Sequence, residues 1–199
     1  MPWTRICALT LTSVALLLAT LALTGATYEG KQSAMKRAKR LERGKYLTTI
    51  CGCNDCHTPG TFYGAPDFSR QLSGSDLGWQ GPWGVTFARN LTPDTDTGIG
   101  NWKEADIIKA FRSGMRPNGT MLLPPMPWQD YSTMSDDDAA AVAAFLKSMP
   151  AVVHKSPDDI PPGQPGVGSI VVFPAPPAWD APKAPPVDDT MKSGAPEKK

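Results

Sequence analysis

The chain has 199 residues, enough for one domain of ordinary size with extensions. Its 20 basic and 19 acidic residues nearly balance, so no overall charge favours binding to nucleic acid. Four cysteines do not make a disulfide framework in a chain of this length, and 21 prolines and 18 glycines predict a loop-rich protein.

An apolar run from Ile6 to Leu23 opens the chain, without charges and preceded by Arg5. Its length fits both the long end of a signal-peptide core and the short end of a spanning helix. Residues 1–30 are therefore predicted to be a signal peptide or a membrane anchor.

A helix is predicted from Ser33 to Ile50, where apolar or small side chains recur at helical spacing. Seven basic residues lie between Lys31 and Lys45, and Glu42 is the one acid among them. We interpret this basic face as solvated. Docking of a partner or attraction to anionic lipid headgroups is the alternative.

The motif with the strongest chemical meaning follows this helix: Cys53-x-x-Cys56-His57. Two thiols at this spacing share one face of a helical turn, where both can form thioethers with one porphyrin, and the histidine can ligate its iron. A dithiol redox pair and a zinc site are the competing interpretations. No βαβ pattern surrounds the motif, and beyond it the chain offers only His154 as a further zinc ligand. Cys51 is interpreted as a buried small side chain.

Residues 58–100 are rich in Gly, Pro and Trp and show little periodicity. A loop of this length is unusual unless it wraps a cofactor. Trp79, Trp83 and Trp102 need acceptors for their indole N–H groups when buried. Haem propionates are one candidate set of acceptors, and ordinary core packing is the alternative.

Two further helices are predicted. The first runs from about Lys103 to Ser113, with Asn101 as N-cap, Glu104 completing a capping box and Gly114 ending it. The second follows a Ser135 cap, has three aspartates in its first turn, ends at Pro150, and is expected to pack on the Ser33–Ile50 helix.

The character of the chain changes after Ala151. Twelve prolines fall between Pro150 and Lys199, and only Ser169–Phe173 has the pattern of a strand. Residues 153–199 are therefore predicted to be an extended or disordered Pro-rich tail. Residues from about Pro157 onward are predicted to be dispensable for folding.

If His57 ligates a haem iron, the ligand on the opposite face of the iron determines the function. A methionine there gives an electron carrier, whereas an open position permits ligand binding or enzymatic chemistry. Met126 is the favoured ligand, because Pro124, Pro125 and Pro127 stiffen its segment in a non-helical conformation. The other candidates are Met115, Met121, Met134, Met149 and His154.

These residues resemble the class I cytochrome c family. The chain is similar, more closely, to cytochrome c subunits of membrane-bound bacterial dehydrogenases for alcohols, gluconate and aldehydes. The similarity covers about residues 40–152. Its matching segments are Arg43–Leu47, Cys53–Thr58, Asn90–Asp94, Thr97–Gly100 and Pro125–Pro127.

The resemblance implies an all-α fold, with a few helices and long loops wrapped around one covalent haem c. It implies His57 and Met126 as axial ligands, a monohaem domain at residues 31–152, and electron transfer with a dehydrogenase or a respiratory acceptor. Those subunits typically carry three attachment motifs, whereas this chain has one. Since haem attachment in this family occurs outside the cytoplasm, we expect the domain on the periplasmic side of a bacterial inner membrane, anchored there or secreted. A haem enzyme or small-ligand sensor is the alternative function.

Overall fold

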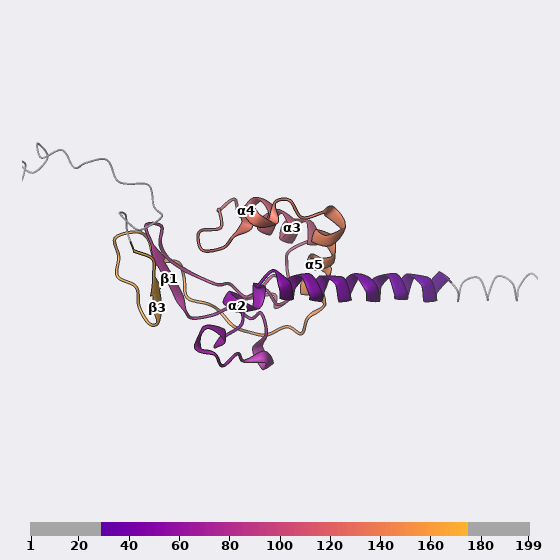
Figure 1. Cartoon of the computed structure of the whole chain (residues 1–199), viewed down its shortest axis with the longest axis horizontal. Coiled ribbons are helices and arrows are strands. Elements are labelled where there is room, and N and C mark those ends of the chain that lie inside the picture. The colour runs from indigo at the N-terminus through magenta and orange to yellow at the C-terminus, as the bar shows by residue number, and fades with distance from the viewer. Residues whose placement is uncertain (1–28, 175–199) are drawn as a thin grey trace, which may run out of the picture.

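The computed structural model describes residues 29–174, and the apolar run Ile6–Leu23 lies outside them. A long N-terminal helix (residues 29–50) leads into the body, where it is followed by α2 (Cys53–His57) and two short 3-10 helices, η1 (Thr61–Tyr63) and η2 (Phe68–Arg70). The remaining elements are β1 (Gly78–Gly81), β2 (Gly84–Phe87), α3 (Glu104–Ser113), α4 (Trp128–Tyr131), α5 (Asp136–Ser148) and β3 (Ile170–Val172). Figure 1 shows α3, α4 and α5 together, the sheet at the other end of the body, and the N-terminal helix projecting away from it.

The N-terminal helix packs against α5, as predicted. Gly44 lies at the crossing, where an added Cβ would overlap the carbonyl of Ala141 and meet the Phe145 side chain. Arg43 secures the contact through an ion pair with Asp138 at 2.8 Å. Leu47, Val142 and Leu146 join the hydrophobic core that the two helices enclose with α3.

The two predicted helices are confirmed, with one difference at a cap. Ser135 caps α5 by accepting the Asp138 N–H, and Gly114 ends α3 in the left-handed conformation at φ 72°. The prediction of Asn101 as the cap of α3 is wrong. Its side-chain amide donates to the Thr95 carbonyl, and the N-cap is Lys103, two residues later, whose N–H donates to the Asp106 carboxylate at 2.9 Å.

The expectation of a purely α-helical fold is also wrong, because the described residues include a three-stranded sheet. Strands β1 and β2 form an antiparallel hairpin, and β3 adds to β1 in parallel, in the order β2-β1-β3. The strand pattern noted at Ser169–Phe173 corresponds to β3. The hairpin arises within the Gly-rich region that was predicted to be a cofactor-wrapping loop, where Gly81 and Gly84 pair across its tight turn.

Residues 150–174, here called the C-terminal arm, are extended, as their proline content predicts, but they are not free. Asn90 donates its side-chain amide to the Val152 carbonyl at 2.7 Å, and Val85 and Ile160 exchange two backbone hydrogen bonds of 2.8 Å each. Phe173 packs against Trp79 and Trp83. Contacts with the body therefore continue past Pro157, the residue from which the chain is predicted to be dispensable, and that prediction remains to be tested by truncation. Residues 175–199 lie outside the described part.

Across residues 29–174, no helix combines the length and apolar character needed to cross a membrane. Residues 1–28 of the proposed signal peptide or anchor lie outside this range.

The crossing at Gly44 gives a stability prediction. Gly44→Ala should lower the free energy of unfolding by about 1–3 kcal/mol, because the methyl group forces the N-terminal helix away from α5. Denaturant unfolding measures this loss. Gly30→Ala in the same helix is the matched control, since a Cβ there meets nothing within 4 Å. The control should be neutral or slightly stabilising through helix propensity, and equal effects of the two changes would contradict the packing argument.

The contacts of the C-terminal arm give a second prediction. A chain ending at Pro157 should melt several degrees below a chain ending at Pro174, because it loses the Val85–Ile160 hydrogen bonds and the Phe173 packing. Each 1 kcal/mol lost lowers the midpoint of a domain of this size by about 2–4 °C. Identical thermal midpoints would show that the arm adds nothing to the fold.

Candidate haem site

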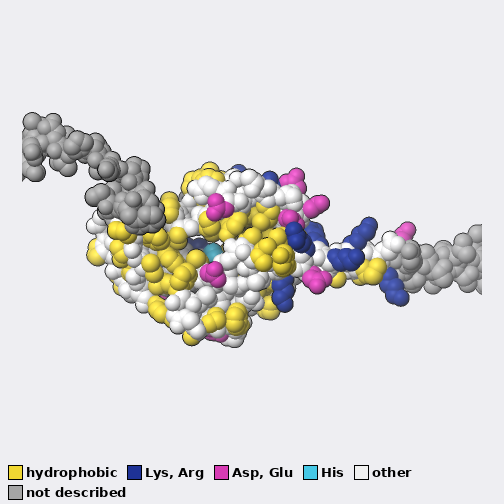
Figure 2. All heavy atoms as spheres, viewed as in Figure 1, with side chains coloured by type: hydrophobic (Ala, Val, Ile, Leu, Met, Phe, Trp, Pro, Cys, Tyr) yellow, Lys and Arg dark blue, Asp and Glu magenta, His cyan; other side chains and the backbone are white. Residues whose placement is uncertain are grey.

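A large cavity lies between the helical and the sheet sides of the described body. It encloses about 610 Å³, within the range of cofactor sites, and most of its lining is apolar. Ile107, Phe111 and Val142 line it from the helices, and Trp79 and Phe87 line it from the sheet. Figure 2 shows a hollow on this face, surrounded by hydrophobic side chains, with a histidine visible inside it.

The predicted attachment motif forms one wall of this cavity. Cys53, Cys56 and His57 occupy the five-residue helix α2, and all three line the cavity. Burial raises the pKa of the Cys53 thiol to about 12 and also raises the pKa of Cys56. Redox-active dithiols depend on a lowered thiol pKa, so this environment speaks against a dithiol redox pair.

The His57 ring is held by one hydrogen bond that fixes its tautomer. Nδ1 lies 2.7 Å from the Arg89 carbonyl oxygen. A carbonyl oxygen only accepts, so Nδ1 carries the proton and Nε2 keeps its lone pair. Burial lowers the pKa of His57 and so favours the neutral ring, although the hydrogen bond to the Arg89 carbonyl acts in the opposite direction. A neutral imidazole with one nitrogen anchored by a backbone carbonyl is the arrangement of a metal-binding histidine.

Met126 also lines the cavity, on a segment held from two sides. Thr86 of β2 donates its hydroxyl to the Pro124 carbonyl at 2.7 Å, and the Leu122 N–H donates to the Gly114 carbonyl at 2.7 Å. Met126 is not among the side chains packed against the hydrophobic core. Its thioether is therefore not explained as core filling.

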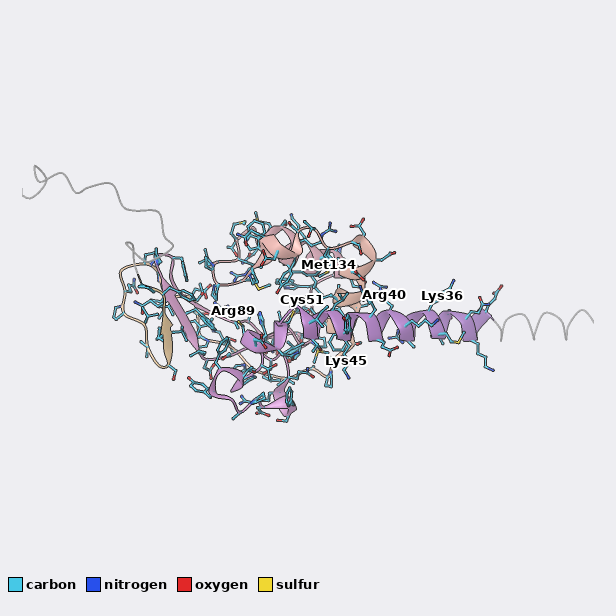
Figure 3. The ribbon with its side chains drawn as sticks, in the orientation of Figure 1. Lys36, Arg40, Lys45, Cys51, Arg89 and Met134 are labelled. Carbon is cyan, nitrogen blue, oxygen red and sulfur yellow. The ribbon has the colours of Figure 1, made fainter. Side chains whose placement is uncertain are left out.

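The structure separates the other candidate ligands. Met134 lines the cavity as well, but it packs against the core. Met115 and Met121 pair with each other in an isolated bridge outside the cavity, and Met149 belongs to the core side of α5. His154 bonds to the Ser73 carbonyl and to Asp76, away from the cavity lining. Figure 3 shows Met134 on the helical side and Arg89 towards the sheet.

The three tryptophans of residues 79–102 also differ in whether they line the cavity. Trp79 and Trp102 line the cavity, whereas Trp83 does not. The Trp83 indole N–H donates to the Trp79 carbonyl at 3.2 Å, so it has an acceptor within the protein.

Several cavity residues escaped the sequence analysis. Arg89 and Arg116 bring two guanidinium groups to an otherwise apolar lining. Tyr131 lines it too, and its hydroxyl donates to the Cys51 carbonyl at 2.7 Å. Thr48 is 1% exposed and lines the cavity, but its hydroxyl has no hydrogen-bond partner among residues 29–174. The arginine beside the Asn90–Asp94 motif was a usable signal, whereas nothing in the sequence marked Thr48.

A closed metal site of the zinc type is not formed by the motif. Within residues 29–174, no three His, Cys, Asp or Glu side chains converge as metal ligands.

Comparison with curated proteins gives several relatives that are named as cytochromes. The chain is 34% identical over 121 residues to the cytochrome c subunit of a quinone-dependent alcohol dehydrogenase from Gluconobacter oxydans, covering 59% of this chain and 24% of that protein. It is 35% identical over 123 residues to the cytochrome c subunit of gluconate 2-dehydrogenase from Pantoea cypripedii, covering 61% and 26%. It is 33% identical over 112 residues to a diheme cytochrome c-type protein from Cereibacter sphaeroides, covering 54% and 36%.

These relatives confirm the resemblance to cytochrome c subunits of bacterial dehydrogenases. The chain spans only about a quarter to a third of the length of these three proteins. No family model matches it.

Proposed function

We propose that this protein is an electron-transfer c-type cytochrome with one covalently attached haem. Cys53 and Cys56 would hold it through thioethers, and His57 would be the proximal iron ligand. The observation that carries the proposal is the His57–Arg89 hydrogen bond, which leaves Nε2 free to bind iron in the same cavity that both motif cysteines line.

The cavity suits a haem in size and in chemistry. Its apolar lining matches the macrocycle, and Arg89 and Arg116 offer positive charge for the propionates. Burial lowers the pKa of Arg116, although the charge of Asp159 acts in the opposite direction. The buried Thr48 hydroxyl, which has no partner among residues 29–174, also indicates that the cavity holds a bound group, since an unpartnered buried polar group is costly. When bound, the haem supplies an iron that changes by one electron.

We propose Met126 as the distal ligand, which favours a carrier over an enzyme. Met126 lines the cavity on a segment stiffened by prolines and tied to β2 through Thr86. A neutral thioether favours ferrous iron and raises the reduction potential. A held segment of this kind suits a carrier, because it keeps small ligands from the iron.

The names of the relatives suggest the redox partner, and the N-terminal sequence suggests the location. A dehydrogenase subunit or respiratory protein would exchange single electrons with the haem, as the names of the relatives suggest. We propose a periplasmic position for a haem domain that starts near residue 31, with residues 1–30 as leader or anchor. The support is the apolar run Ile6–Leu23 together with the need to attach haem outside the cytoplasm.

The first prediction concerns attachment and export. Produced in a host that attaches haem, the protein should keep its haem stain on a denaturing gel, and the stain should follow the periplasmic or membrane fraction. A Cys53→Ala, Cys56→Ala double variant should lose the stain, because no thioether can form. Cys51→Ala is the control and should retain it. Haem that extracts into acidic organic solvent would refute covalent attachment, and mature haem protein mainly in the cytosol would refute export.

The second prediction concerns the distal ligand. Met126→Ala should remove the weak sulfur-to-iron band of the ferric protein, lower the reduction potential and allow carbon monoxide to bind the ferrous protein. Optical spectra and a redox titration measure all three effects.

Two methionine variants serve as its controls. Met134→Ala tests the other methionine of the cavity, and Met121→Ala tests one outside it. Both should keep the band and the potential. If the band instead disappears in Met134→Ala, that residue is the ligand. Ready binding of carbon monoxide by the unmutated protein would favour a haem enzyme or sensor.

A further inference from the structure

The C-terminal arm contacts the part of the chain that anchors the proximal histidine. Phe87, Ala88 and Arg89 line the cavity and lead to the carbonyl that binds His57. Residues 156–160 of the arm hold this segment from outside, since none of them lines the cavity. The arm therefore reaches the haem site only through other residues.

The backbone leading to Arg89 is fixed by the arm at consecutive points. Val85 and Ile160 exchange backbone hydrogen bonds, and the Phe87 N–H donates to Asp159 Oδ1 at 3.3 Å. The Ser156 hydroxyl donates to the Ala88 carbonyl at 2.7 Å, and Ser156 is 3% exposed. The peptide that ends in the Arg89 carbonyl is thus placed by contacts from residues more than 65 positions later in the chain.

Asp159 also controls the charge beside the cavity. Its Oδ1 lies 2.7 Å from Arg89 Nη2, and its Oδ2 lies 4.0 Å from Arg116 Nη1. Both arginines line the cavity, and among residues 29–174 their ion pairs involve no other carboxylate. The Arg89 guanidinium donates to the Pro157 carbonyl at 2.6 Å as well, so the arm holds its side chain and its main chain together.

We propose that Ser156 and Asp159 are positioning residues that lower the reduction potential of the haem from outside its cavity. This inference rests on the proposed function. Ser156 keeps the Arg89 carbonyl in place for the His57 N–H, and a firmly bound Nδ1–H makes the imidazole a better electron donor to iron. Asp159 offsets the two arginines, and less positive charge near the iron stabilises its ferric form. Both effects act in the same direction.

The test uses the full chain with haem attached and compares two adjacent carboxylates. Asp159→Asn should raise the potential, changing the equilibrium constant of one-electron reduction by up to about tenfold, or about 59 mV. Asp158→Asn is the matched control, because Asp158 is 83% exposed and its ion pair is with Lys155 at 3.7 Å. A solvent-screened charge of this kind should shift the potential much less. Asp159→Glu should restore most of the original value.

Ser156→Ala separates positioning from charge. It removes the hydrogen bond to Ala88 without changing any charge, so it should raise the potential slightly. The His57 ring N–H proton, followed by NMR in the ferrous protein, should exchange with water faster than in the unmutated protein. A role limited to overall stability would lower the thermal midpoint without these two changes.

Equal potentials for Asp159→Asn and Asp158→Asn would overturn the role of Asp159. Unchanged exchange of the His57 ring proton in Ser156→Ala would overturn the role of Ser156. If Asp159→Asn yields no haem protein, Ser156→Ala still decides whether the arm positions His57. Failure of the proposed function itself would be seen separately, as an unmutated protein without covalent haem or without a histidine-ligated spectrum.

Discussion

The hydrogen bond from His57 Nδ1–H to the Arg89 carbonyl is the constraint on which the rest of the site depends. It joins residues 32 positions apart and decides which ring nitrogen can bind a metal. The donor comes from a helix of five residues, which is too short to be stable alone. The acceptor lies two residues beyond the end of a short hairpin strand. Neither element would hold this geometry unaided, so the surrounding contacts have to supply the rigidity.

These contacts come from three distant parts of the chain. The N-terminal helix carries the motif into the body and crosses α5 at Gly44, where the absence of a side chain allows the helices to touch. The loop at residues 90–97 is closed by hydrogen bonds among Asn90, Thr92 and Thr97. Asn90 also donates to the Val152 carbonyl and so holds the start of the C-terminal arm. The cavity of about 610 Å³ is lined both by helices and by residues of the hairpin. The buried hydrogen bonds around it explain how walls of such different kinds keep their positions.

Local sequence signals predicted the parts of the fold that local forces determine. The Ser135 cap and the Gly114 terminus rest on contacts within a few residues, and the spacing of the attachment motif sets which side chains share a helical turn. The packed arm was missed because β3 pairs with β1, about 90 residues earlier in the chain. The hairpin was missed although its strands are neighbours, because its Gly-rich sequence lacks the regular alternation of apolar and polar residues that marks a strand. The most informative acceptor in the site, the Arg89 carbonyl, is a backbone atom, and every residue carries one. Its identity follows only from the three-dimensional arrangement.

The contacts that hold the Met126 and His57 segments favour an electron carrier over an enzyme. Substrate turnover requires a distal segment that opens, whereas a carrier needs both ligand segments in the same place in both oxidation states. Here the Met126 segment is tied through Thr86 to β2, and the His57 acceptor lies just beyond the end of that same strand. One strand therefore supports both faces of the cavity. A movement large enough to open the Met126 side would also disturb the His57 side. Both sides therefore depend on β2 and on the C-terminal arm that holds it.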